Sequence, residues 1–74
     1  RRDWTQERVL ALAPEADREA WKRLFERHPG ALMLPISSSR GSAAVLVDGA
    51  SGAIAAYSAL DPWPVVNAAR RAGK

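Results

Sequence analysis

The run Ser37-Ser38-Ser39-Arg40-Gly41-Ser42 is the segment whose residue types come closest to binding chemistry. Hydroxyl groups, backbone amides beside a glycine and one guanidinium group can together hold a phosphate. The spacing differs from that of a phosphate-binding P-loop, which requires Gly-x-x-x-x-Gly-Lys-Ser/Thr. We therefore interpret residues 37–42 as a polar loop between two strands.

Side chains suited to acid–base or metal chemistry are few and scattered. His28 is the single histidine and the chain has no cysteine, so the spacing of a zinc site is absent. The eight carboxylates fall at positions typical of helix caps, turns and exposed helix faces, and none forms a pair in a desolvated cleft. We predict that the domain is not an enzyme and uses no cofactor and no metal.

The basic residues provide a candidate nucleic-acid surface. The 74 residues include 11 Lys and Arg against 8 Asp and Glu, which gives a formal net charge of +3. This excess is compatible with nucleic acid but does not require it. The members of a phosphate-facing patch would be Arg40, Arg70, Arg71 and Lys74. Nucleic-acid binding through this patch is the alternative function.

Aromatic and small residues provide a candidate protein interface. Trp63 stands between two prolines, so its position is pre-organised and little entropy is lost when it docks. The stretch 53–60 is rich in alanine, and an edge strand in a soluble protein is either covered or used for binding. The predicted interface residues are Trp63, Ala53, Ala55, Tyr57 and Ala59.

Length and composition indicate one small domain spanning residues 1–74. Of the residues, 47% are hydrophobic, but many are alanine, so the core is thin and a partner would add burial. There is no apolar run of about 18 residues and no signal-peptide pattern, so we predict a cytoplasmic protein without a membrane partner. Because the chain starts at Arg1 rather than Met, we interpret it as part of a larger protein.

Helical patterns flank a central β region. Residues 3–13 are expected to form a short helix capped by Asp3 or Thr5, and Pro14 is expected to open a second helix that ends near residue 27. A last helix is expected over residues 64–72, led by Asp61 or Trp63 and ended by Gly73.

Three strands are expected between these helices, at residues 31–36, 43–48 and 53–60. The turn at residues 48–53 is rich in Asp, Gly and Ser and lies between apolar runs, which predicts a hairpin. The fold class is therefore α+β, in the order ααβββα, with a three-stranded antiparallel meander packed by helices. Two strand faces are expected to meet Trp21, Leu24 and Phe25 of the second helix. The members of these faces are Leu32, Leu34 and Ile36 on the first strand and Ile54, Ala56 and Leu60 on the last.

Two family resemblances bear on function. The order from the second helix onward is similar to that of double-stranded-RNA-binding domains, but Asp61-Pro62-Trp63-Pro64 stands where that family carries a lysine-rich, glycine-rich signature. Residues 3–16 resemble a segment near the start of bacterial SWIM zinc-finger family proteins, often Trp-Thr-x-Glu-x-Val-Leu-x-Leu-Ala-Pro-Asp-Ala. The zinc motif itself is absent, so this resemblance implies only an accessory or adaptor module of a bacterial protein.

The leading prediction from these observations is a non-catalytic protein–protein interaction or accessory module. Its partner would be another protein or a second copy of the same chain.

Overall fold

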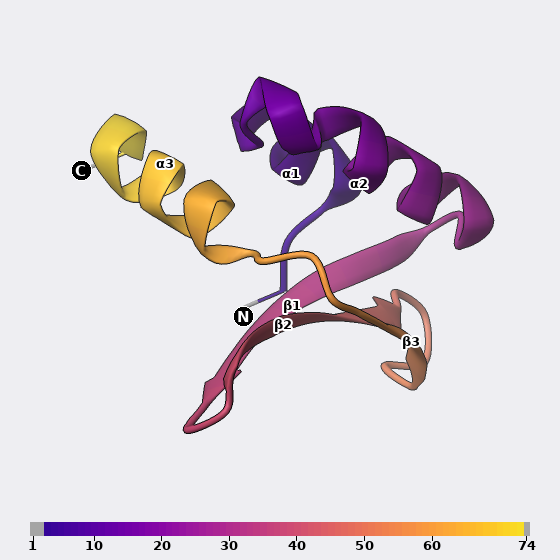
Figure 1. Ribbon diagram of the computed structural model, residues 1–74. Helices are drawn as coiled ribbons and strands as arrows, with labels where there is room; N and C mark the ends of the chain where they lie inside the picture. The colour runs from indigo at the N-terminus through magenta and orange to yellow at the C-terminus, as the bar shows by residue number, and fades with distance from the viewer. Residues whose placement is uncertain (1–2, 74) are drawn as a thin grey trace.

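Two helices precede three antiparallel strands, and a third helix follows them. The computed structural model describes residues 3–73 (Figure 1). Along the chain the elements are α1 (Gln6–Leu12), α2 (Glu15–Arg27), β1 (Ala31–Ser38), β2 (Gly41–Asp48), β3 (Ile54–Ser58) and α3 (Trp63–Gly73). The strands form one sheet in the order β1-β2-β3. The predicted α+β class and the ααβββα order are confirmed.

The first helix takes its cap from Thr5. The Oγ1 of Thr5 accepts a hydrogen bond of 3.2 Å from the backbone N–H of Arg8. The helix stops at Leu12 because Ala13, which precedes a proline, is extended, with φ −65° and ψ 142°. The guanidinium group of Arg18 then donates to the carbonyl oxygens of Leu10 at 3.1 Å and Ala13 at 2.9 Å. This side chain of α2 satisfies carbonyls that the end of α1 leaves unpaired.

The first hairpin is longer than expected. β1 and β2 pair from Ala31 opposite Asp48 to Ser38 opposite Gly41, so only two residues remain in the turn. The hydroxyl of Ser38 accepts from the N–H of Arg40 at 3.2 Å, and Gly41 takes a φ of 127° that other residues rarely adopt. The polar loop expected at residues 37–42 is therefore wrong, because its outer residues continue the ladder.

The second hairpin forms where the Asp-Gly-Ser turn was expected. The N–H of Asp48 donates to the carbonyl of Ala53 at 2.8 Å, and the N–H of Gly52 donates to the carbonyl of Asp48 at 2.8 Å. The Asp48 carboxylate also accepts from the hydroxyl of Ser51 at 2.7 Å and from its N–H at 3.0 Å. These two hydrogen bonds lower the pKa of Asp48, because they stabilise the ionised form.

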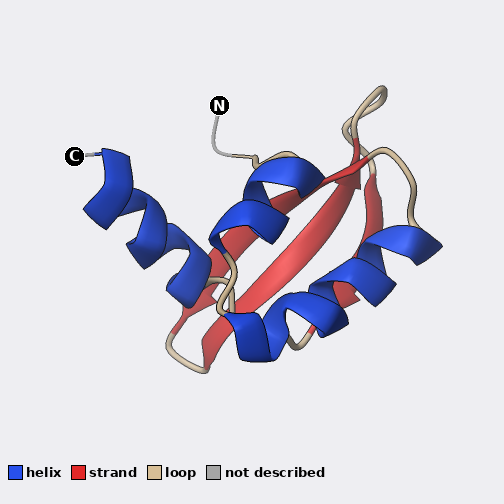
Figure 2. Cartoon of the chain, turned by 90° about the horizontal axis from the view of Figure 1, so that it is seen from above, coloured by secondary structure: helices blue, strands red, loops and turns tan. Residues whose placement is uncertain are grey.

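All three helices cover the same face of the sheet. Figure 1 shows them above the strands, and Figure 2, seen from the helical side, shows the strands running behind them. The core lies between the two layers. Its fully buried large side chains are Val9, Trp21, Met33, Leu46 and Val65. The rings of Trp21 and Phe25 pack with their centroids 5.7 Å apart.

The face of β1 that meets the helices is the opposite of the one expected. Met33 and its partner Leu46 are fully buried in the core, so Leu32, Leu34 and Ile36 lie on the far side of the sheet. Alternation could not decide between the faces, because residues 31–36 are apolar at every position. Packing against Trp21 and Phe25 selected the face that carries the unbranched Met33.

On β3 the expected face is split by a bulge. Ala56 lies opposite Leu46 and packs against the core together with Leu60, as predicted. The register shifts between Leu46 and Val47, which places Ile54 opposite Val47 on the far side of the sheet. A bulge adds one residue to one strand and so changes which face the residues beyond it occupy. The expected contact of Ile54 with α2 is therefore wrong.

The two edges of the sheet differ. Trp4 forms an isolated bridge to β1 at Met33. The backbone N–H of Trp4 donates to the carbonyl of Met33 at 2.7 Å, and the carbonyl of Trp4 accepts from the N–H of Met33 at 2.8 Å. Pro35, further along β1, has no N–H to offer. In the described part of the chain, no segment pairs with the outer side of β3.

Candidate protein-interaction surface

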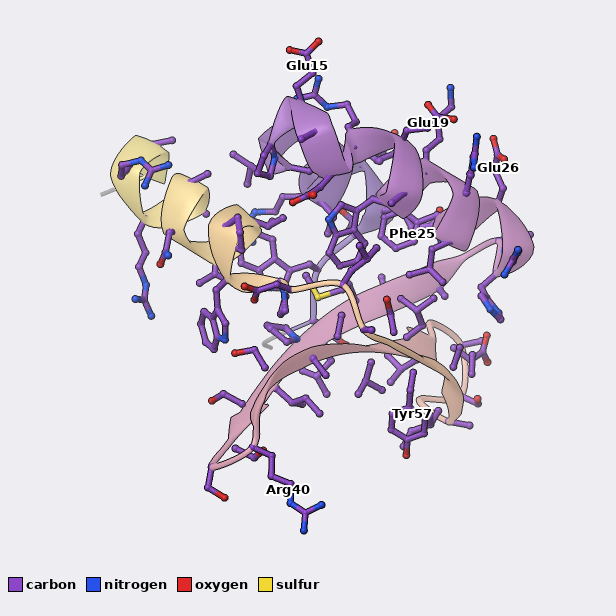
Figure 3. The ribbon with its side chains drawn as sticks, in the orientation of Figure 1. Glu15, Glu19, Phe25, Glu26, Arg40 and Tyr57 are labelled. Carbon is purple, nitrogen blue, oxygen red and sulfur yellow. The ribbon has the colours of Figure 1, made fainter. Side chains whose placement is uncertain are left out.

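The sheet face that points away from the helices is apolar. Its residues, which we call the outer face, alternate with the core residues along each strand. They are Leu32, Leu34 and Ile36 of β1, Val45 and Val47 of β2, and Ile54 and Tyr57 of β3. Figure 3 shows Tyr57 below the sheet, on the side opposite Phe25 of α2. In the described residues, no helix or loop covers this face (Figure 1).

The exposure of side chains differs strongly across the outer face. Val45 and Val47 on the central strand are only 4% and 8% exposed, because the taller side chains of the neighbouring strands flank them. Ile54 and Tyr57 on β3 are 57% and 71% exposed. The exposed part of this face is therefore a ridge on β3, beside a central strand that its neighbours cover.

Charge is nearly absent from the strands that build this face. β1 and β3 contain no charged residue, and β2 contains only Asp48 at its end, within the second turn. An antiparallel sheet with one solvated face usually alternates apolar residues inside with polar residues outside. This sheet has apolar residues on both sides, which is typical of a sheet covered on both sides.

A second feature lies at the β1 edge, where α3 and the N-terminal segment meet the sheet. A cleft of about 390 Å³ is lined by Trp4, Pro35, Trp63, Val66 and Arg70. The polar groups of these side chains, two indole N–H groups and one guanidinium, are all donors. The guanidinium of Arg8 lies 4.0 Å from the centre of the Trp4 ring, so one face of that indole is already occupied.

The predicted interface residues do not share one surface. Tyr57 belongs to the outer face, whereas Trp63 begins α3, where its N–H donates to the Asp61 carboxylate at 3.0 Å, and lines the cleft on the helical side. Ala55 is exposed on β3 at the bulge. Ala53 and Ala59 are exposed immediately before and after that strand. The structure thus places four of the five around β3 and the fifth elsewhere.

The predicted basic patch is likewise divided. Arg40 occupies the β1–β2 turn, at the tip that points away from the helices (Figure 3). Arg70 and Arg71 lie in the last turn of α3, and Arg70 faces the cleft. Lys74 lies outside the described residues. The structure therefore does not bring Arg40 together with the two arginines of α3.

Side chains able to bind a metal do not cluster in residues 3–73. That part of the chain contains no group of three or more His, Cys, Asp or Glu side chains placed to hold a metal ion.

The carbonyl of His28 accepts from the Gln6 side chain at 2.9 Å, which fixes the end of α2 to the start of α1. No helix in the same range is long and apolar enough to cross a membrane.

Sequence reasoning missed most of the outer face. It assigned the three apolar residues of β1 to the core and gave no role to Val45 and Val47. A usable signal was present, since residues 31–36 and 43–47 are apolar at both odd and even positions, which point to opposite sides of a strand. Continuous apolar strands predict a sheet that is buried on both faces.

Comparison with models of protein families, with curated proteins and with solved structures found no match to this chain. The likeness of residues 3–16 to SWIM zinc-finger family proteins stays a prediction.

Proposed function

We propose that this domain is a non-catalytic module that binds protein through its outer face. The observation that carries the proposal is the pairing of Val45 and Val47 with apolar neighbours on both adjacent strands, on a side of the sheet that no helix of residues 3–73 covers. Contiguous exposed apolar surface on a small domain is typical of interaction sites. An accessory or adaptor role in a bacterial cytoplasmic protein is the setting that we propose from the sequence.

Burial energetics supports this reading. Removing apolar surface from water contributes about 25 cal/mol per Å². A 74-residue chain has few large core side chains with which to offset its conformational entropy. Ile36, Ile54 and Tyr57 on the outer face remain 40%, 57% and 71% exposed, so folding leaves part of their possible burial unused. A protein partner would recover it.

Binding to an apolar dye tests whether the outer face of the folded protein is an accessible apolar binding surface. We expect the chain to bind anilinonaphthalene sulfonate while its tryptophans keep their near-ultraviolet circular dichroism. Ile54→Lys and Tyr57→Lys should reduce binding, because each places a charge on the ridge. Ala20→Lys, at an exposed position on α2, is the matched control and should bind as the parent does. Equal dye binding by the parent and both ridge variants would contradict the proposal.

A nucleic-acid titration distinguishes the alternative. Binding through Arg40, Arg70, Arg71 and Lys74 would weaken steeply with salt, because each neutralised phosphate releases counterions. Because Arg40 and Arg70 lie on separate parts of the domain, we expect no binding of labelled DNA or RNA at low salt. Salt-dependent binding that is lost in an Arg70→Ala, Arg71→Ala double variant would favour the alternative function instead.

A further inference from the structure

We propose that the cleft at the β1 edge is a second binding site of this domain, and that its ligand is an extended acidic segment of another protein. In that segment carboxylates alternate with apolar side chains. The apolar side chains would lie against the indoles of Trp4 and Trp63, and a carboxylate would pair with Arg70. This site is separate from the outer face, so the inference goes beyond the proposed function.

The cleft is one half of a longer groove along α3. Beside the hollow of about 390 Å³ lies a second hollow of about 380 Å³, and both are lined by Trp4, Val66 and Arg70. Trp63 lines the first hollow and Arg8 lines the second. Each volume falls in the range of about 300–1,000 Å³ that is typical of ligand sites. Because the two hollows share a wall, they offer room for a stretch of chain rather than for one small group.

The charge of the groove is complementary to a carboxylate. Within residues 3–73, no acceptor pairs with the Arg70 guanidinium or with the indole N–H of Trp4 or Trp63. None of the described residues that line either hollow is Asp or Glu. Asp61, which lies two residues before Trp63, accepts the backbone N–H of Trp63 instead. A bound carboxylate would accept from Arg70 in a charge-assisted hydrogen bond, which is stronger than a bond between neutral groups.

The apolar part of the groove favours a peptide over a nucleic acid. Trp4 and Trp63 are half-buried, so each presents part of its ring to a ligand. Aromatic-lined grooves commonly receive extended peptides, whose backbone carbonyls can accept from the indole N–H groups. A nucleic acid is held by a series of cations along its phosphates. Here only two guanidinium groups line the groove, and that of Arg8 already lies over the Trp4 ring.

A titration followed by tryptophan fluorescence tests for this ligand on the whole chain. The probe is the blocked peptide acetyl-Glu-Leu-Pro-Glu-Leu-Pro-Glu-amide, and the control peptide carries Gln in place of each Glu. We expect the acidic peptide to bind with a dissociation constant of about 1 mM or lower at low salt. The Gln peptide should bind about tenfold more weakly, because it cannot form the charge-assisted bond. No saturable binding of the acidic peptide, or equal binding of both peptides, overturns the proposal.

A pair of matched variants tests the role of Arg70. Arg70→Gln should weaken binding of the acidic peptide by about tenfold. Arg71→Gln is the control, because Arg71 lies in the same last turn of α3 and carries the same charge but lines neither hollow. It should bind as the parent does. Equal losses in the two variants would show attraction by net charge alone and would overturn the proposal.

Two further measurements identify the site and the class of ligand. Tyr57→Lys, on the outer face, should bind the acidic peptide as the parent does. Loss of peptide binding in Tyr57→Lys but not in Arg70→Gln would place the peptide on the outer face and overturn the proposal. A short oligothymidylate that binds more tightly than the peptide, and whose binding is lost in Arg70→Gln, would make nucleic acid the ligand and overturn it as well. Dye binding by the outer face is unaffected by each of these outcomes, so the proposed function is tested separately.

Discussion

Met33 and Leu46 lie directly opposite each other on β1 and β2, and both side chains are fully buried beneath the helices. The next pair along, Leu34 and Val45, points to the other side of the sheet. This alternation decides which apolar residues form the core and which form the outer face.

The two faces should therefore differ in their contribution to stability. Met33→Ala is expected to lower the free energy of unfolding by about 2–5 kcal/mol, because it leaves a cavity between the sheet and the helices. Leu34→Ala, at a half-buried position of the outer face, should lower it by about 1 kcal/mol. Urea unfolding of dilute protein measures both values. A larger loss for Leu34→Ala than for Met33→Ala would reverse the assignment of the faces.

Trp21 should tolerate loss of its polar atom. It is fully buried, and its indole N–H has no hydrogen-bond partner. A buried donor without a partner costs about 1–3 kcal/mol, so Trp21→Phe removes this cost while it gives up part of the packing. We expect the stability of Trp21→Phe to stay within about 1 kcal/mol of the parent in urea unfolding, by the same balance. Phe25→Ala, which removes packing alone, is the comparison and should cost about 3–5 kcal/mol.

Arg18 should matter for the junction of α1 and α2. Its planar guanidinium reaches two carbonyl oxygens at once, and an ammonium group on a lysine stem has no matching fork. Arg18→Lys is expected to lower the free energy of unfolding by about 1 kcal/mol. Arg27→Lys, at an exposed position on the same helix, should have no effect on thermal unfolding. Equal melting temperatures for both variants would show that the Arg18 contacts contribute nothing.

The Asp48–Ser51 turn should make stability depend on acid pH. Because hydrogen bonds from Ser51 hold the pKa of Asp48 below its ordinary value of 3.8, the turn stabilises the fold above that value. The stabilisation is lost as the pH falls through the lowered pKa. Ser51→Ala should raise the pKa of Asp48, which carboxyl nuclear magnetic resonance measures directly. The stability difference between parent and variant should be present at neutral pH and vanish in acid, whereas a constant difference would exclude this linkage.

The element order was predictable because each element carries its own local pattern. The Asp48 turn, Pro14 and Asp61 mark boundaries through backbone chemistry that needs no distant partner. The faces were not predictable in the same way. Residues 31–36 are apolar at both odd and even positions, so their alternation does not identify the buried side. The bulge that turns Ile54 outward depends on how β3 pairs with β2. The division of the predicted basic patch likewise depends on the relative placement of the first hairpin and α3.

Solvent accessibility of individual methyl groups, measured with a soluble paramagnetic agent, tests the central claim most directly. In dilute protein we expect the methyl groups of Leu34 and Ile54 to relax strongly, while those of Leu46 and Val65 in the core stay protected. Protection of Leu34 and Ile54 in dilute, monomeric protein would contradict the account, because the outer face would then be covered by the chain itself.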